Sequence, residues 1–296
     1  MPLVAPDPPF LAAGRTDEVA AIILGAPLDA TESFHSGTRE APRRIRAVSD
    51  VLETFSPTLG SDLAQLGLVD WGDVSCGQDV DAALAAIADA IEDACGHGLP
   101  LLIGGEHTAT LGAVRGALRR HPGLQVIQID AHADLRDQYD GLRTSHATVM
   151  RRIADAVGLD RICQYGIRSG ISEEFELARS CLHSGADLVL TRQVRDRIHT
   201  RPVYLTIDID VLDPSCAPGT GCPEPGGPNF RELLSFLYSL QDLRVIGVDV
   251  MEVLPAADVN DITSIAAAKL LREAALLFAS PKSKAQSPKS RATPDV

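Results

Sequence analysis

The sequence predicts an α/β protein with a mostly parallel sheet of about eight strands, covered by helices on both faces. Three observations predict this class. Short β-branched or apolar runs alternate with amphipathic helical segments along the chain. The chain has 296 residues, of which 45% are apolar, enough to form one large core. Aromatic residues make up only 4%, which suits a helix-rich protein of this class.

The eight expected strands are short apolar runs, and amphipathic segments separate several of them. Because the runs read as buried on both faces, a parallel arrangement is favoured. In chain order, the expected strands are Ala20–Gly25, Leu66–Asp70, Leu101–Gly104, Leu124–Asp130, Ile162–Gly166, Asp187–Leu190, Val203–Asp208 and Val245–Val250.

Four amphipathic helices are expected from apolar residues that recur at helical spacing. They are Asp81–Gly96, Thr108–His121, Asn229–Leu240 and Thr263–Phe278. The pattern leaves two architectures open, an open doubly wound sheet and a closed eight-stranded barrel. Both place their chemistry at the carboxyl ends of the strands.

The two ends of the chain differ in composition from the region between them. Residues 1–14 are rich in proline, lack the features of a signal peptide, and are expected to form a flexible segment. Residues 280–296 are rich in Ser, Pro and Lys and are expected to form a disordered tail. No linker interrupts residues 15–279, so we expect a single domain there.

Composition also argues against several kinds of partner. The net charge is −13, whereas nucleic-acid binding needs a basic face. No apolar stretch approaches the ~18–20 residues that span a bilayer. The six cysteines include no Cys-x-x-Cys pair and are typical of reduced thiols in a cytoplasmic protein.

Three polar clusters each follow an expected strand. Gly104–Thr108 reads Gly-Gly-Glu-His-Thr, Asp130–Asp134 reads Asp-Ala-His-Ala-Asp, and Asp208–Asp210 reads Asp-Ile-Asp. Taken singly, each could be a turn or a helix cap. In a parallel sheet, however, all three would converge at one edge, and alternate residues of an extended chain point the same way.

Together the clusters supply four carboxylates and two imidazoles. Four negative charges at one buried edge require compensating cations, and two divalent ions would neutralise them. Oxygen and nitrogen donors without thiolate favour Mn²⁺ over Mg²⁺, Co²⁺ or Zn²⁺. The candidate metal ligands are His107, Asp130, His132, Asp134, Asp208 and Asp210.

The three clusters, in this order, resemble the motifs of the ureohydrolases, the family of arginases and agmatinases. The resemblance covers roughly residues 20–278 and implies an arginase-like three-layer α/β/α fold rather than a barrel. Further matching segments are Gly25–Asp29, Gly37–Pro42, Asp208–Pro214, Ala217–Gly227 and Asp249–Pro255.

The resemblance implies a site with two Mn²⁺ ions per chain and a homotrimer or homohexamer. It implies that the six candidates are ligands and that Asp134 also hydrogen-bonds the reaction intermediate. It further implies that His146 protonates the leaving amine and that Glu252 pairs with the guanidinium. Without the resemblance, His146 would be taken as a helix-start histidine and Glu252 as half of a structural salt bridge.

The implied reaction is hydrolysis of a small cationic guanidino compound with release of urea. Water is a poor nucleophile at neutral pH, and two cations can lower its pKa from ~15.7 towards ~7. Arginases carry a Ser-x-Asn-x-His element and an acidic segment after Gly-(Ile/Leu)-Arg. In the corresponding segments here, neither the serine nor the asparagine is in place in Leu142–His146, and Gly166–Ile171 contains no acid. Agmatine, cleaved to putrescine, is therefore the expected substrate.

Several alternatives remain open. Rivals within the class are guanidinobutyrase, aminopropylagmatine ureohydrolase, arginase and formimidoylglutamase. Preference for guanidinobutyrate would require a basic residue such as Arg39 or Arg143 in the pocket. An inactive regulator of the same fold would be expected to lack a ligand or His146, and none is missing. A metal-dependent deacetylase would carry tandem histidines, and no His-His pair occurs. Cys216 and Cys222 lie in the expected active-site loop, without an assigned role.

Overall fold

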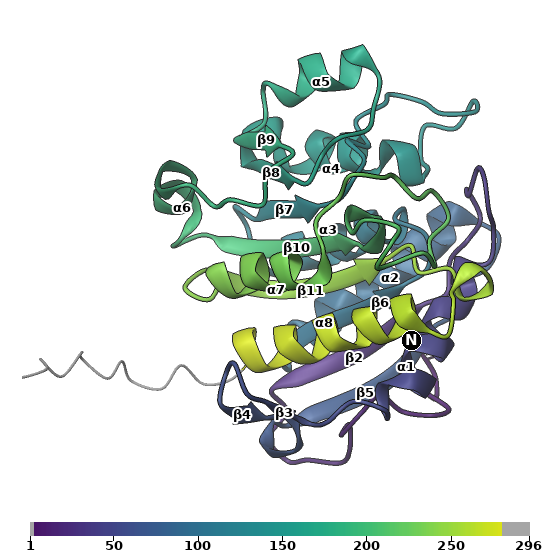
Figure 1. Cartoon of the computed structure of the whole chain (residues 1–296), viewed down its shortest axis with the longest axis vertical. Helices are drawn as coiled ribbons and strands as arrows, with labels where there is room; N and C mark the ends of the chain where they lie inside the picture. The colour runs from purple at the N-terminus through teal and green to yellow at the C-terminus, as the bar shows by residue number, and fades with distance from the viewer. Residues whose placement is uncertain (1–2, 280–296) are drawn as a thin grey trace, which may run out of the picture.

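The computed structural model describes residues 3–279 and consists of a sheet between two layers of helices (Figure 1). Within these residues the main sheet has nine strands in the order β1-β5-β2-β6-β11-β10-β7-β8-β9. The strands are β1 (Leu3–Val4), β2 (Ala21–Ala26), β5 (Leu68–Val74), β6 (Leu99–Gly104), β7 (Gln125–Ile129), β8 (Ile162–Tyr165), β9 (His183–Gly185), β10 (Pro202–Asp208) and β11 (Arg244–Met251).

Eight of these strands run parallel, and only β1 pairs in the antiparallel sense, with β5. The sheet begins at β1 and ends at β9, so it is open and not a barrel. A separate small hairpin pairs β3 (Phe55–Ser56) with β4 (Ser61–Asp62).

Helices cover both faces of the sheet. One face carries α1, α6, α7 and α8, and the other carries α2, α3, α4 and α5. Figure 1 shows α7 and α8 in front of the sheet, with α2 and α3 behind it. The eight helices of the described residues are α1 (Ala41–Ser49), α2 (Val80–Ala94), α3 (Ala109–Arg120), α4 (Val149–Val157), α5 (Ser172–Ala178), α6 (Arg192–Ile198), α7 (Phe230–Ser239) and α8 (Ile262–Phe278).

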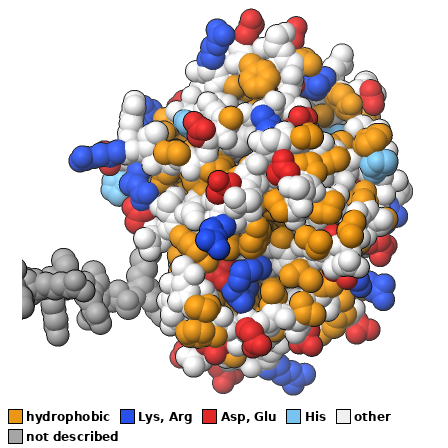
Figure 2. Space-filling view, in the orientation of Figure 1, with side chains coloured by type: hydrophobic (Ala, Val, Ile, Leu, Met, Phe, Trp, Pro, Cys, Tyr) orange, Lys and Arg blue, Asp and Glu red, His pale blue; other side chains and the backbone are white. Residues whose placement is uncertain are grey.

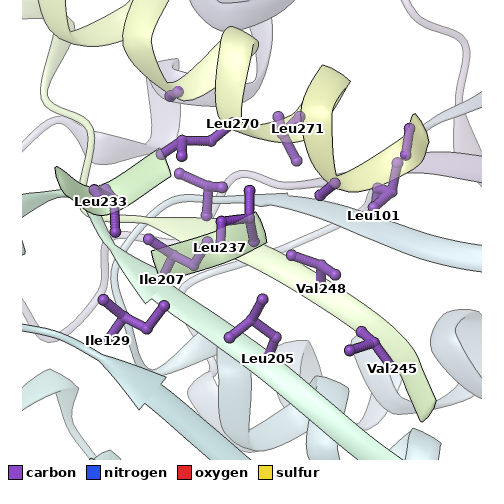
Figure 3. Close-up of a cluster of buried hydrophobic side chains, with 14 of the residues drawn as sticks. Leu101, Ile129, Leu205, Ile207, Leu233, Leu237, Val245, Val248, Leu270 and Leu271 are labelled. Carbon is purple, nitrogen blue, oxygen red and sulfur yellow. The ribbon is translucent and has the colours of Figure 1, made fainter. Parts of the chain in front are cut away.

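Alternation along the strands divides the core into two clusters. Leu205 and Ile207 of β10 belong to the cluster under α7 and α8, whereas Tyr204 belongs to the cluster on the opposite face. Figure 3 shows Leu237 of α7 and Leu270 of α8 above these strands. Burial of both faces explains why the central strands read as continuous apolar runs.

Local sequence also explains where helices begin. The Asn229 side chain accepts hydrogen bonds from the backbone N–H groups of Arg231 and Glu232, and the Glu232 carboxylate accepts from the Asn229 N–H. This reciprocal capping fixes the start of α7. Asp79 caps α2 in a similar way, by accepting from the N–H of Ala82.

The four expected helices are present, as are seven of the eight expected strands with shifted ends. The largest shift is in β5, which begins at Leu68 rather than Leu66 and runs to Val74. The prediction of a strand at Asp187–Leu190 was wrong, since the edge strand is His183–Gly185. Leu188 and Leu190 pack against the core from a loop while Val189 is exposed, and this alternation imitated a strand.

The N-terminal segment packs against the domain instead of standing apart from it. β1 pairs with β5, and the side chain of Phe10 is buried in the core. The packed part of the chain therefore begins before residue 15, where we expected the domain to start. The expected tail at residues 280–296 lies outside the described residues.

Two surface properties bear on possible partners. Figure 2 shows acidic, basic and hydrophobic side chains intermixed on the face that α7 and α8 cover. Within residues 3–279, none of the helices has the length and apolar character that crossing a membrane requires.

The strand order brings distant parts of the chain together at the centre of the sheet. After β6 the chain continues to β7, and the gap between them is filled by β10 and β11, the last two strands. The carboxyl ends of β6, β11, β10 and β7 are therefore neighbours. Ligands of open α/β sheets bind at such points, where the strand order reverses.

Candidate metal centre

All six predicted ligands lie together at the carboxyl ends of the central strands. His107 follows β6, the Asp130–Asp134 segment follows β7, Asp208 ends β10, and Asp210 lies in the short helical turn after it. A pocket of about 230 Å³ opens over them. His146 and Glu252 also line this pocket, whereas Asp130 is fully buried and is not among the lining residues.

The first group of ligands surrounds one nitrogen of His107. Nδ1 lies 3.1 Å from Asp130 Oδ2, 3.3 Å from Asp134 Oδ2 and 3.3 Å from Asp208 Oδ2. This nitrogen is buried without a hydrogen-bond partner, while Nε2 lies 2.9 Å from Thr206 Oγ1. An imidazole lone pair facing three carboxylate oxygens fits a divalent cation.

The second group surrounds His132 and shares Asp130 with the first. His132 Nδ1 lies 2.8 Å from Asp210 Oδ2 and 3.8 Å from Asp130 Oδ1. Asp130, His132 and Asp210 offer ligand atoms within 4.8 Å of one another. Because the two oxygens of Asp130 face different groups, the residues fit two adjacent cations with one shared carboxylate.

The protonation behaviour of these residues reflects uncompensated charge. Burial, together with the charge of Asp130, raises the pKa of Asp134 to about 7. Burial opposes the charged form of His132, but the charge of Asp210 outweighs it and raises the pKa of His132 to about 11. Without bound cations, these raised pKa values favour the protonated forms of Asp134 and His132, and cations would displace those protons.

The two glycines of the Gly-Gly-Glu-His segment allow close packing at the end of β6. A Cβ atom at Gly104 would lie 1.7 Å from Met251 Sδ, and one at Gly105 would lie 2.0 Å from the carbonyl oxygen of Leu28. A side chain at Gly104 would crowd Met251 of β11, and one at Gly105 would meet the backbone that follows β2. This close approach explains why glycine occupies both positions in the segment that leads to the candidate ligand His107.

Two candidate residues lie in the left-handed region of backbone conformation. Asp134 has φ 53° and Glu252 has φ 64°. Such values are uncommon outside glycine and are concentrated at functional sites. Here both side chains line the pocket.

His146 is held in one orientation above the ligands. Its Nδ1–H donates to the Thr31 carbonyl at 2.8 Å, so Nε2 is left as an acceptor, 3.1 Å from Ser33 Oγ. Burial lowers the pKa of His146. Nε2, the ring nitrogen that can gain or lose a proton, therefore lies on the side of Ser33, which also lines the pocket.

Glu252 is held by the backbone of the candidate ligand His107. Its Oε1 accepts from the His107 N–H at 2.6 Å. Burial raises the pKa of Glu252 well above its ordinary value. Cys222 also lines the pocket, and burial, reinforced by the charge of Glu252, raises the pKa of its thiol to about 12. Cys216 instead donates to the Asp213 carbonyl, and all six cysteines are free.

The rim of the pocket contains residues that sequence reasoning missed. Arg136 lines the pocket, its Nε lies 3.4 Å from Glu174 Oε2, and its guanidinium stacks 5.1 Å from the centre of the Tyr139 ring. Arg136 comes two residues after Asp134, and this proximity was the available signal. Glu174, far along the chain, gave none.

The two basic residues that guanidinobutyrate binding would require in the pocket do not line it. Arg39 pairs with Asp29, and the side chain of Arg143 is 70% exposed, 3.7 Å from Asp137. Leu142, which begins the segment corresponding to the arginase Ser-x-Asn-x-His element, is also exposed. It lies in the turn that follows Tyr139.

Comparison with known proteins identifies the family of the chain. The Arginase family model matches residues 19–277. An agmatinase from Bacillus subtilis is 39% identical over 269 residues, covering 88% of this chain and 93% of its own. A guanidinobutyrase from Pseudomonas aeruginosa is 35% identical over 87% of this chain and 86% of its own. The crystal structure of agmatine ureohydrolase from Thermoplasma volcanium has a TM-score of 0.80 and 32% identity, covering 91% of this chain and 94% of that one. The chain therefore belongs to the Arginase family.

Proposed function

We propose that this chain is a hydrolase with two Mn²⁺ ions that releases urea from agmatine and leaves putrescine. The observation that carries the proposal is a pair of His/Asp groups sharing Asp130, beneath His146 and Glu252 in one pocket. Membership of the Arginase family supports the reaction class. The agmatinases among the similar proteins support the choice of substrate.

The residues divide the chemistry between them. Two bound divalent cations would activate water and stabilise negative charge as it develops. The six ligands hold those cations, and Glu252 orients the guanidinium. Because burial lowers the pKa of His146, Nε2 is unprotonated near neutral pH. It can accept a proton from the water that is consumed and deliver it to the leaving amine.

The charge of the rim favours agmatine over arginine. Arg136 is the one Lys or Arg among the described residues that line the pocket, and Glu174 neutralises it. Ser169 and Gly170 line the same wall and carry no charge. The terminal ammonium of agmatine can contact the Tyr139 ring and Glu174. The carboxylate of arginine would find no uncommitted cation there.

A guanidino acid is the second candidate substrate class. Arg136 is its supporting observation, since a carboxylate could displace Glu174 from the guanidinium. The similarity to a guanidinobutyrase agrees with this candidate.

A substrate comparison tests the assignment. With Mn²⁺ loaded, we expect kcat/KM for agmatine to exceed that for arginine by at least ~10²-fold, because an unpaired buried carboxylate costs several kcal/mol. The measurement is urea release from agmatine, arginine and guanidinobutyrate. R136Q should still turn over agmatine, and it should abolish any turnover of guanidinobutyrate. A preference for arginine would refute the substrate assignment, and a preference for guanidinobutyrate lost in R136Q would establish the second candidate.

We also propose that the chain forms a homotrimer or homohexamer in the cytoplasm. The family resemblance supports the assembly, and the six free cysteines support a reducing compartment. Light scattering of the full chain measures the mass of the assembly, and a monomeric mass would contradict it.

A further inference from the structure

A buried carboxylate behind the metal centre has no part in the mechanism described so far. Asp249 lies within β11, beside Thr206 of β10 and Leu102 of β6, and is fully buried. It is not one of the candidate ligands. A carboxylate inside a sheet is costly unless its surroundings compensate it. One of its oxygens, Oδ1, has no hydrogen-bond partner.

The other oxygen of Asp249 ends a chain of hydrogen bonds that begins at a ligand. Asp249 Oδ2 accepts from Thr110 Oγ1 at 2.9 Å. Thr110 Oγ1 lies 3.2 Å from Thr206 Oγ1, which lies 2.9 Å from His107 Nε2. The four side chains come from β11, α3, β10 and the segment after β6, and each is at most 1% exposed.

If all three contacts are hydrogen bonds and Asp249 is ionised, one arrangement of hydrogens satisfies them. A hydroxyl has a single hydrogen, and Thr110 uses its own on the carboxylate. Thr206 must then donate to Thr110, and its oxygen accepts from His107 Nε2–H. The neutral ring carries its one hydrogen on Nε2, which leaves the lone pair of Nδ1 directed at the three carboxylates of the first ligand group.

We propose that Asp249 is a positioning residue for the first cation, acting on His107 through Thr110 and Thr206. The inference rests on the proposed two-metal function and deepens it. Partners behind a ligand that fix the tautomer of a histidine commonly change metal affinity by 10- to 100-fold when removed. Here the orienting charge lies two hydroxyl groups away from the ring.

Replacing Asp249 by asparagine allows the direction of the chain to reverse. The amide of D249N can donate to Thr110, so that Thr110 donates to Thr206 and Thr206 to Nε2. The hydrogen of His107 would then sit on Nδ1, where it blocks the cation. T110V breaks the chain without reversing it, and T110S keeps the hydroxyl as the matched conservative change.

The test is Mn²⁺ titration of the metal-free full chain by calorimetry, with the fold of each variant checked by thermal unfolding. We expect D249N and T110V to lower the affinity for one of the two ions by ~10- to 100-fold and to leave the affinity for the other unchanged. T110S should keep the wild-type affinity for both. If D249N fails to fold, T110V and T110S carry the comparison. Wild-type affinities for both ions in folded T110V would overturn this inference alone. Fewer than two ions in the wild type would overturn the proposed function as well.

Discussion

The floor and the rim of the pocket are built in different ways. The floor consists of the six candidate ligands, and all but His132 are at most 7% exposed. The rim consists of Ser33, Arg136, Tyr139, His146 and Ser169, which stand on the loops that follow β2, β7 and β8. Floor residues lie at the strand ends or within a few residues of them, whereas rim residues lie farther along the loops. In the proposed function the floor would hold the cations, whereas the rim would supply the proton carrier His146 and the contacts that choose the substrate.

The largest expected effect is the loss of a floor ligand. D210A removes the carboxylate that faces His132 Nδ1, so we expect fewer than two bound ions. Urea release should fall by more than ~10⁴-fold, beyond the usual size of a lost proton transfer. Elemental analysis and urea assay measure the two effects. D89A, an exposed acid on α2, is the control, and full metal content in D210A would contradict the role of the floor.

The next effect concerns the rim histidine. H146A should lower kcat by ~10²- to 10⁴-fold because a positioned proton carrier is lost. Both ions should stay bound, since His146 is not among the ligands. If H146A lost bound metal as well as activity, the rim and the floor would not act independently. Unchanged turnover at neutral pH would make His146 a bystander.

A smaller effect is expected from the contacts that hold His146. The hydroxyl of Thr31 accepts from the His146 N–H at 3.2 Å and bonds to the buried Glu106. T31V should lower kcat roughly 5- to 10-fold, the size of one lost hydrogen bond, and T31S should restore it. In the H146A background T31V should have no further effect. Additive losses in the double variant would show that Thr31 acts elsewhere.

The smallest expected effect is on stability after chelation. In the metal-free protein the pKa of Asp134 is raised to about 7 and that of His132 to about 11, so the folded state binds protons more tightly than the unfolded state. Its stability should therefore fall as the pH rises from about 5 to about 8. Bound Mn²⁺ requires deprotonated ligands, so its stabilisation grows over the same interval. The gap in Tm between loaded and chelated protein should widen with pH, at roughly 2–4 °C for each kcal/mol. A Tm gap that narrows as the pH rises would contradict the view that the floor carries uncompensated charge when no metal is bound.

The same contrast explains what could be predicted from the sequence. The ligands follow strands whose apolar runs are unmistakable, and parallel strands bring their ends to one edge of the sheet. The rim was predicted poorly, because loop paths depend on distant contacts such as the pair Arg136–Glu174. The edge strand at His183–Gly185 was missed for a related reason, since its pairing with β8 comes from tertiary structure and not from strand-forming residues.

The insertion of β11 at the centre of the sheet has a consequence for biosynthesis. β11 pairs with β6 on one side and β10 on the other, joining positions as far apart in the chain as Leu101 and Val248. It also delivers Glu252 to the site. During translation the N-terminal half therefore emerges with the β6 edge open, and the sheet closes only when the last strand leaves the ribosome. A nascent chain that ends before Arg244 would expose the β6 and β10 edges, and His107 after β6 would not yet be held beside Asp208 of β10. We therefore expect metal uptake to follow near-complete synthesis.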